Sequence, residues 1–235
     1  ALANNKIEYE VCDMAVGYGT EYLAGLIKKF NPDLLGISIM SFMYHRSYDI
    51  IRFAKTIKPS LNIVAGGPHV STMADKALED CQKIDYGITM EGEEAIIELC
   101  REKPLSEING LIYRQSGRII VNKQRDFTTE LHKLKFPTYE KFPLERYVTE
   151  EIGIVSSRGC PYKCIYCPVR TAIGKRWRKR NPESIIQEIK YWYNRGYRQF
   201  SILDDNFTLE KKRVLEICRK ICDYNFDNIE LNCNN

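Results

Sequence analysis

The chain has 235 residues and a formal net charge of +4, with 44% hydrophobic and 28% charged residues. This length and apolar content suffice for one or two hydrophobic cores, and the sequence has no apolar run long enough to span a membrane. The charge excess is too small to require a nucleic acid as partner. Nine cysteines, an odd number, without a secretory signal at the start, argue against a disulfide framework and predict a location in the reducing cytoplasm.

The first hundred residues alternate between strand-like and helix-like segments. The predicted strands cover residues 7–13, 33–38, 61–65 and 85–89, and the predicted helices cover residues 21–30 and 48–57. This order predicts a doubly wound, flavodoxin-like α/β domain over residues 1–104. Residues 1–5 look like the tail of a helix, so we expect that one strand-helix unit is missing before them.

Three of these predicted strands are followed by glycine-rich or polar loops. The residues singled out there as candidates for ligand binding are Ser38, Ser41, Gly66, Gly67, Pro68, His69, Glu91, Gly92 and Glu93. Glycine lets the backbone approach a flat or bulky ligand closely. A tight turn alone also explains a Gly-Gly pair, so the three loops indicate a binding site only when taken together.

Residues 105–150 are expected to connect this domain to the next one. Two short apolar segments at 110–114 and 118–122, separated by a polar turn, predict a β-hairpin. A proline-bearing segment at 134–143 follows, and the residue before a proline disfavours the helical conformation. We therefore predict an extended linker that leads to a second domain over residues 151–235.

A cluster of three cysteines gives the strongest functional signal in the chain. Cys160, Cys164 and Cys167 form a C-x3-C-x2-C pattern shortly after an apolar, strand-like segment at 152–156. Three thiolates at this spacing can ligate three irons of a 4Fe-4S cluster and leave the fourth iron open. A zinc site is the alternative, although zinc sites usually add a second pair of Cys or His, and no such pair follows. The other cysteines are interpreted as core thiols: Cys12, Cys81, Cys100, Cys218, Cys222 and Cys233.

Downstream of the cysteines the pattern changes to repeated strand-helix units. A basic run at 175–180 is interpreted as a solvated connector rather than a phosphate site, and Asn181-Pro182 then begins a helix as N-cap and first helical residue. The further predicted elements are the rest of this helix to residue 193, a strand at 199–203, a helix at 209–224 and a strand at 228–232. Such units form a parallel sheet or barrel, whose ligands bind at the C-terminal ends of the strands. Cys160 and the acidic pair Asp204 and Asp205 fall at such ends, although the acidic pair could also cap the following helix.

The pattern C-x3-C-x-aromatic-C, preceded by Arg158-Gly159, resembles the radical S-adenosylmethionine (SAM) superfamily. In that family SAM binds the fourth iron of the cluster through its amino and carboxylate groups. The site residues that the resemblance implies are Cys160, Cys164 and Cys167 as cluster ligands, Tyr166 near the adenine of SAM, and Asp204 and Asp205 as acceptors for its ammonium group. The implied fold is a partial (β/α) barrel, and we expect it to be truncated here after three strands.

The three loops of the first domain resemble, in their order, the cobalamin-binding domain that precedes the radical domain in many radical SAM enzymes. An older cobalamin signature, Ser-x-Leu followed by Gly-Gly, is matched only approximately by Ser38-x-Met40 and Gly66-Gly67. The Asp-x-His-x-x-Gly motif, which supplies a histidine ligand to cobalt, occurs nowhere in the chain. The lower-face ligand of the cobalt therefore stays open, and we interpret His69 as a neighbour of the corrin rather than as a cobalt ligand.

Together the two resemblances imply a cobalamin-dependent radical SAM enzyme. Such an enzyme cleaves SAM to a 5'-deoxyadenosyl radical and uses cobalamin as the methyl carrier for methylation of an unactivated carbon. A cobalamin-dependent radical SAM cyclase or oxidoreductase is the alternative within the family, and a zinc-binding module without catalysis is the alternative outside it. The implied partners are a small-molecule substrate and an electron donor such as a ferredoxin or flavodoxin.

Overall fold

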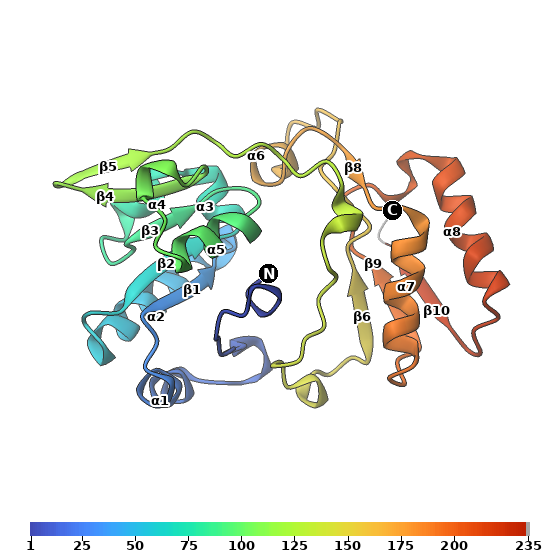
Figure 1. Cartoon of the computed structure of the whole chain (residues 1–235), viewed down its shortest axis with the longest axis horizontal. Coiled ribbons are helices and arrows are strands. Elements are labelled where there is room, and N and C mark those ends of the chain that lie inside the picture. Colours follow the sequence, from blue (N-terminus) through green and yellow to red (C-terminus); the bar gives the residue numbers. More distant parts are fainter. Residues whose placement is uncertain (234–235) are drawn as a thin grey trace. The chain divides into compact units, whose positions relative to one another are not determined.

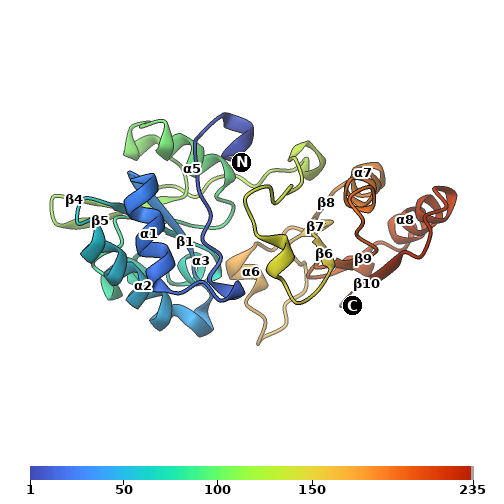
Figure 2. The ribbon, with the colours of Figure 1, turned by 90° about the horizontal axis from the view of Figure 1, so that it is seen from below.

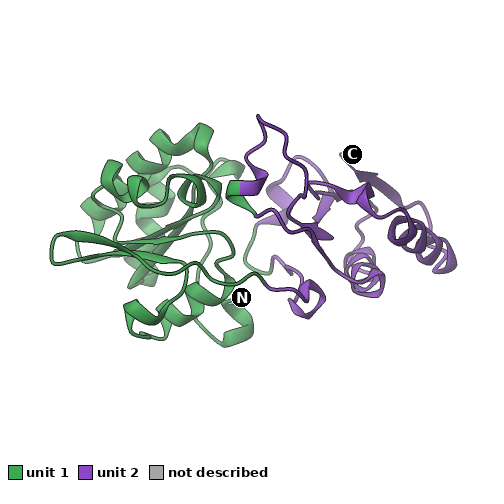
Figure 3. Cartoon of the chain, turned by 90° about the horizontal axis from the view of Figure 1, so that it is seen from above, with its two compact units in different colours: residues 1–127, 140–142, 171–173 green, residues 128–139, 143–170, 174–235 purple. Residues whose placement is uncertain are grey.

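The computed structural model describes residues 1–233 and divides the chain into two compact units (Figure 3). Unit 1 consists of residues 1–127, 140–142 and 171–173, and unit 2 consists of residues 128–139, 143–170 and 174–235. Asn234 and Asn235, the last residues of the predicted second domain, lie outside the described residues. None of the described helices is both long and apolar enough to cross a lipid bilayer.

Unit 1 is built on a five-stranded mixed sheet (Figure 1). Its strands, in spatial order, are β1 (Leu34–Ser38), β2 (Asn62–Gly66), β3 (Tyr86–Ile88), β4 (Leu111–Gln115) and β5 (Arg118–Val121). The first three are parallel and are joined by helical crossovers, as parallel strands require. The hairpin β4–β5 pairs antiparallel to β3. The hairpin expected in the connector therefore extends the sheet of the first unit.

Helices cover both faces of this sheet. They are α1 (Thr20–Phe30), α2 (Tyr44–Ile57), α3 (Pro68–Met73), α4 (Asp75–Asp80) and α5 (Glu93–Cys100). Because side chains alternate along a strand, Ile63 and Ala65 of β2 belong to one core cluster with α1 and α2, whereas Val64 belongs to a second cluster with α5. Helix α5 accordingly lies on the other side of the sheet from α2 (Figure 2). The expected α/β fold with helices on both faces is confirmed.

The structure corrects the prediction of a strand at residues 7–13. This segment is irregular and leads into a 3-10 turn, Met14–Val16, whose N-cap residue Asp13 accepts a hydrogen bond from the Ala15 N–H at 2.9 Å. Alternating polarity is not sufficient for a strand, because a strand also needs a partner that pairs with its backbone. Within residues 1–233 no strand pairs with this segment, and the Tyr9 carbonyl accepts a hydrogen bond from Lys141 instead.

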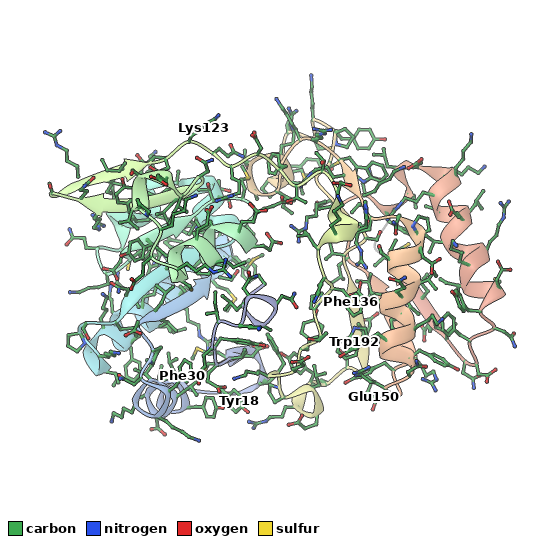
Figure 4. The ribbon with its side chains drawn as sticks, viewed as in Figure 1. Tyr18, Phe30, Lys123, Phe136, Glu150 and Trp192 are labelled. Carbon is green, nitrogen blue, oxygen red and sulfur yellow. The ribbon has the colours of Figure 1, made fainter. Side chains whose placement is uncertain are left out.

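Unit 2 contains a three-stranded parallel sheet in the order β10 (Glu230–Cys233), β9 (Gln199–Ile202), β6 (Glu151–Ile154). Helices α7 (Pro182–Tyr193) and α8 (Lys211–Asp223) connect these strands and lie on the same side of the sheet (Figure 2). The Asn181 side chain caps α7 by accepting a hydrogen bond from the Ser184 N–H at 2.8 Å. Trp192 of α7 is buried in the core between helix and sheet (Figure 4). The repeated strand-helix pattern predicted for this region is confirmed.

Shorter elements complete the two units. A small antiparallel pair, β7 (Ser157–Arg158) and β8 (Arg178–Lys179), brackets the cysteine region, which also contains the one-turn helix α6 (Val169–Ala172). Further 3-10 helices occupy Ala3–Asn5, Ser41–Met43, Leu105–Glu107, Leu131–Lys133, Leu144–Arg146 and Phe207–Leu209.

Two side-chain predictions for unit 2 were wrong. Cys218 and Cys222 are exposed on α8, because Ile217 and Arg213 hold the inward positions of that helix. Cys233 is exposed as well, whereas Cys81 is buried, and Cys12 and Cys100 are partly buried. The basic run is not uniformly solvated, since Arg178 and Arg180 are buried.

Candidate cofactor sites

The first candidate site lies at the C-terminal ends of β6 and β9 in unit 2. Asp204 follows β9 and is only 4% exposed. Its Oδ1 accepts hydrogen bonds from the backbone N–H groups of Ser156 and Ser157, at 2.6 and 2.9 Å. Its Oδ2 accepts hydrogen bonds from the hydroxyl groups of the same two serines, both at 2.6 Å. Asp204 therefore joins the end of β9 to the chain that leads from β6 into the cysteine loop.

A buried arginine and a tryptophan complete this network. Arg213, the inward residue of the first turn of α8, donates from Nη2 to the Ser156 carbonyl at 2.8 Å and to the Ser156 hydroxyl at 2.7 Å. The indole Nε1 of Trp177 donates to the Ser157 hydroxyl at 3.1 Å. Burial lowers the pKa of Arg213, and the charge of Asp204 opposes that shift. Each serine hydroxyl thus accepts a hydrogen bond from Arg213 or Trp177 and donates one to the Asp204 carboxylate.

A buried ion pair supports the same strand end. Arg180 is held by Glu188 of α7, and its Nη1 also donates to the Val155 carbonyl at 3.2 Å. Burial raises the pKa of the Glu188 carboxyl, while the charge of Arg180 acts in the opposite direction. Sequence reasoning missed Arg180, Glu188 and Arg213. The available signal was spacing, because Arg213 stands four residues before the buried Ile217 on the inward face of α8.

Asp205 has a different environment from its neighbour. Its carboxylate is only partly buried and accepts a hydrogen bond from the backbone N–H of Gly159, the residue directly before the first cysteine. Burial raises the pKa of Asp205 above its ordinary value of 3.8, the Gly159 hydrogen bond opposes this rise, and the charge of Asp204 adds to it. A cation placed against Asp205 would favour its ionised form. Asp205 is therefore the acid of the pair that is suited to a cationic ligand group.

The cysteine loop begins at a position that only glycine fills without strain. Gly159 has φ of +83°, and a Cβ atom there would lie 2.5 Å from the Arg176 carbonyl oxygen and 2.9 Å from that of Gly174. The next residue, Cys160, donates its N–H to the Gly174 carbonyl at 3.3 Å. The start of the loop is thus packed directly against backbone segment 174–176.

The three cysteines occupy one loop, but their side chains do not converge. Cys160 and Cys167 are partly buried and Cys164 is exposed, with a hydrogen bond of 3.2 Å from the Cys167 N–H to the Cys164 carbonyl. Within residues 1–233 no three His, Cys, Asp or Glu side chains are grouped closely enough to hold a metal ion. The donor set of three thiols on one exposed loop fits an iron-sulfur cluster chemically. Tyr166, the predicted neighbour of adenine, is 86% exposed on this loop.

The second candidate site is formed by the loops that follow β1, β2 and β3 in unit 1. The Ile39 N–H donates to the Gly66 carbonyl at 2.9 Å, and the Ile39 carbonyl accepts from the His69 N–H at 3.0 Å. Gly67 has φ of +88°, and a Cβ atom there would lie 2.8 Å from the Ser38 hydroxyl oxygen. These contacts bring the predicted residues of the first two loops together. Pro68 begins α3 directly after them.

The third loop is bonded to the second. The Met90 N–H donates to the Ser71 hydroxyl of α3 at 2.8 Å. Glu91 and Gly92 then lead into α5, which begins at Glu93. All three predicted loops therefore meet at the C-terminal edge of the parallel strands, the usual position of ligands in such folds.

His69 is part of the protein interior. It is 4% exposed, with Nε2 at 3.1 Å from the Tyr48 hydroxyl and Nδ1 at 3.4 Å from the Ser41 hydroxyl. The ring also stacks on Tyr44, at 4.9 Å between centroids. Burial lowers the pKa of His69, so the neutral imidazole is favoured. With both ring nitrogens in contact with hydroxyl groups, His69 supports the loop after β1.

Three apolar side chains lie exposed on this loop, and two of them, Phe42 and Met43, were not singled out from the sequence. Met40, Phe42 and Met43 follow β1, and Phe42 is 80% exposed. Large apolar side chains at a surface mark binding sites when they occur together. The loop after β1 thus offers apolar groups beside the hydroxyl groups of Ser38 and Ser41.

Comparisons with known proteins match both halves of the chain. Residues 1–100 match the family model of the B12 binding domain, and residues 154–235 match that of the radical SAM superfamily. A protein of Pyrococcus horikoshii named as an uncharacterized methyltransferase is 33% identical over 207 residues, which cover 85% of this chain and 45% of that protein. The anaerobic magnesium-protoporphyrin IX monomethyl ester cyclase of Cereibacter sphaeroides is 22% identical, over 91% of this chain and 37% of the cyclase.

Solved structures show the same fold. The radical SAM methyltransferase TsrM of Kitasatospora setae, solved with tryptophan substrate and a SAM analog bound, superposes with a TM-score of 0.82 at 20% identity, covering 98% of this chain and 49% of TsrM. The cobalamin-dependent radical SAM enzyme OxsB, with aqua-cobalamin and SAM bound, gives a TM-score of 0.80 at 20% identity over 98% of this chain and 34% of OxsB.

The chain spans less than half the length of each of these four proteins. The order of the two matched domains agrees with the two units and with the candidate sites found in them. The chain therefore combines sequence of the B12 binding domain with sequence of the radical SAM superfamily, and over 85% of its length it is similar to a protein named as an uncharacterized methyltransferase.

Proposed function

We propose that the chain is part of a radical SAM enzyme that binds a 4Fe-4S cluster, SAM and cobalamin. The observation that carries this proposal is the attachment of the cysteine loop to the acidic end of β9, where Asp204 accepts hydrogen bonds of 2.6–2.9 Å from Ser156 and Ser157, the residues that lead into the loop. When bound, the cluster would supply an electron for SAM cleavage and the cobalamin a methyl group. The chain's own residues would hold these groups, orient them and keep water away.

In unit 2, Cys160, Cys164 and Cys167 would ligate the cluster. Asp205 would accept a hydrogen bond from the SAM ammonium group, because its side chain is partly exposed and a cation beside a carboxylate favours the ionised form. Tyr166 is exposed on the same loop and would pack against the adenine. The structures of TsrM and OxsB, which hold a SAM analog and SAM respectively, support this assignment.

In unit 1, the loops after β1, β2 and β3 would bind the corrin. Gly66 and Gly67 keep the loop after β2 free of side chains, and the serine hydroxyls of the first loop would bond to the amide side chains of the corrin. Phe42 and its two methionine neighbours would contact the corrin face. His69 would act beneath this loop as a support and not as a cobalt ligand, since Tyr48 and Ser41 occupy its ring nitrogens.

The reaction that we propose is methylation of an unactivated carbon of a small molecule. Relatives named as methyltransferases support it, while relatives named as cyclases make ring closure the second candidate. Reduction of the cluster requires an electron donor, such as a ferredoxin or flavodoxin. A cluster of this kind is consistent with the reducing cytoplasm, where we place the protein.

Anaerobic reconstitution with iron and sulfide tests the metal site. Iron and sulfide content and visible absorbance are measured for the wild type, for Cys164→Ala and for a matched control, Cys218→Ala, which removes an exposed cysteine on α8. We expect the cluster in the wild type and the control, and loss of most bound iron in Cys164→Ala. Equal iron in all three proteins, or a colourless protein that retains zinc, would contradict the proposal.

A second measurement tests the chemistry. The protein, reconstituted and reduced in the presence of SAM, should release 5'-deoxyadenosine. The Cys164→Ala variant should release none. Equal yields from the two proteins would show that SAM cleavage does not depend on this loop.

A further inference from the structure

We infer that the two adjacent acids of unit 2 have separate roles, with Asp204 a positioning residue for the cysteine loop and Asp205 alone available to a ligand. This inference rests on the proposed function for Asp205, whereas the role of Asp204 follows from the network around it. The resemblance to the radical SAM superfamily implied the same role for both acids. Their surroundings in the structure differ in exposure and in hydrogen bonding.

The Asp204 carboxylate is saturated by protein donors. A carboxylate has about four lone-pair sites, and Asp204 receives two backbone and two hydroxyl hydrogen bonds, all between 2.6 and 2.9 Å. Its 4% exposure leaves almost no surface for a ligand. An ammonium group could reach Asp204 only by displacing one of these donors, each of which would then be buried without a partner.

The donors of this network belong to the segment that enters the cysteine loop. Ser156 and Ser157 precede Gly159 by three and two residues, so their fixed backbone directs the chain toward Cys160. Arg213 bonds to the carbonyl and hydroxyl of Ser156 and balances the buried negative charge. Asp204 therefore fixes the segment that enters the loop through Ser156 and Ser157, while Asp205 contacts the loop through the Gly159 N–H.

The network also predicts a signal that needs no bound cofactor. The indole of Trp177 donates to the Ser157 hydroxyl, which in turn donates to Asp204. The only other tryptophan, Trp192, is buried with an Nε1 that has no hydrogen-bond partner among the described residues. In a ¹H–¹⁵N spectrum the two indole signals therefore serve as reporter and internal reference.

The test compares Asp204→Asn, Asp204→Ala, Asp205→Asn and a control, Asp223→Asn, which alters an exposed acid at the end of α8. In the chain without cofactors, Asp204→Asn should shift the Trp177 indole signal and leave that of Trp192 in place. Asp205→Asn and the control should move neither signal. An unmoved Trp177 signal in Asp204→Asn would overturn the role of Asp204, whatever the cofactors do.

After reconstitution, iron per chain and the change of the reduced cluster's EPR spectrum on SAM addition are measured. Asp205→Asn should keep the wild-type iron content and lose the SAM response, whereas Asp204→Ala should lose most of its iron. Asp204→Asn should respond to SAM in proportion to the cluster that it retains. Full iron with a lost SAM response in Asp204→Asn would make Asp204 the SAM ligand and overturn the inference. A wild type that binds no cluster would instead refute the proposed function.

Discussion

Substitution of Gly159 by alanine tests the structure at the entrance of the cysteine loop. Its φ of +83° is strained for any residue with a Cβ atom, at a cost of about 1–2 kcal/mol. The new Cβ would also lie 2.5 Å from the Arg176 carbonyl oxygen, and relief of such overpacking costs about 1–3 kcal/mol because backbone must move. Together these contributions predict a loss of about 2–5 kcal/mol from the free energy of unfolding of unit 2.

Gly196 provides a matched control in the same unit. Its φ is +97°, but a Cβ atom there would meet nothing within 4 Å, so Gly196→Ala should cost only the conformational strain of about 1–2 kcal/mol. Urea unfolding followed by tryptophan fluorescence reports on unit 2, because Trp177 and Trp192 both belong to it. Equal destabilisation by the two substitutions would refute the close packing of Gly159 against residues 174–176.

Three further outcomes follow from buried or exposed side chains. Because burial lowers the pKa of His69, the unfolded chain binds a proton at a higher pH than the folded chain. The free energy of unfolding, measured in urea titrations, should therefore fall as the pH drops below 6.5, and His69→Gln should weaken this pH dependence. An identical pH dependence in the variant would contradict the role of His69. Glu188→Ala leaves Arg180 buried without its ion-pair partner and should lower the free energy of unfolding by about 3–5 kcal/mol. The control Glu183→Ala, on the same helix as Glu188, removes a partly exposed ion pair with Lys220 of α8 and should cost about 0–1 kcal/mol. Phe42→Ala should change the free energy of unfolding by no more than about 0.5 kcal/mol. It should weaken hydroxocobalamin binding about tenfold or more in an absorbance titration, since burial of a Phe side chain gains about 1.5–3 kcal/mol. Unchanged affinity would exclude this loop from the corrin site.

The elements that periodicity and capping specify were predicted well. The Asn181-Pro182 start of α7 is observed, because an N-cap side chain and a proline at the first helical position act through local geometry alone. Strands β1, β2 and β9 also lie close to their predicted positions, since short apolar segments next to helices become buried parallel strands. Residues 7–13 show the limit of this reasoning, because pairing depends on a neighbour that the segment's own sequence does not specify.

The candidate sites were predicted only in part. The spacing of Cys160, Cys164 and Cys167 identified the loop, because their ligand chemistry is encoded in adjacent residues. The difference between Asp204 and Asp205 was not predictable, since the donors to Asp204 come from residues 48 and 47 positions away in sequence. The burial of Arg180 likewise depends on its pairing with Glu188 after α7 has formed.

The two candidate sites also differ in the charge that they offer to a ligand. Ionised groups are costly to bury unless they are paired, and unit 2 pairs its buried charges with protein groups while Asp205 stays partly exposed with a raised pKa. A ligand with an ammonium group, such as SAM, would relieve that cost on binding. In unit 1, the loops after β1 and β2 present serine hydroxyls, backbone and the exposed Phe42, and the buried His69 favours its neutral form. Such surroundings suit a large ligand with an apolar face and neutral amide groups, which is the chemistry of a corrin.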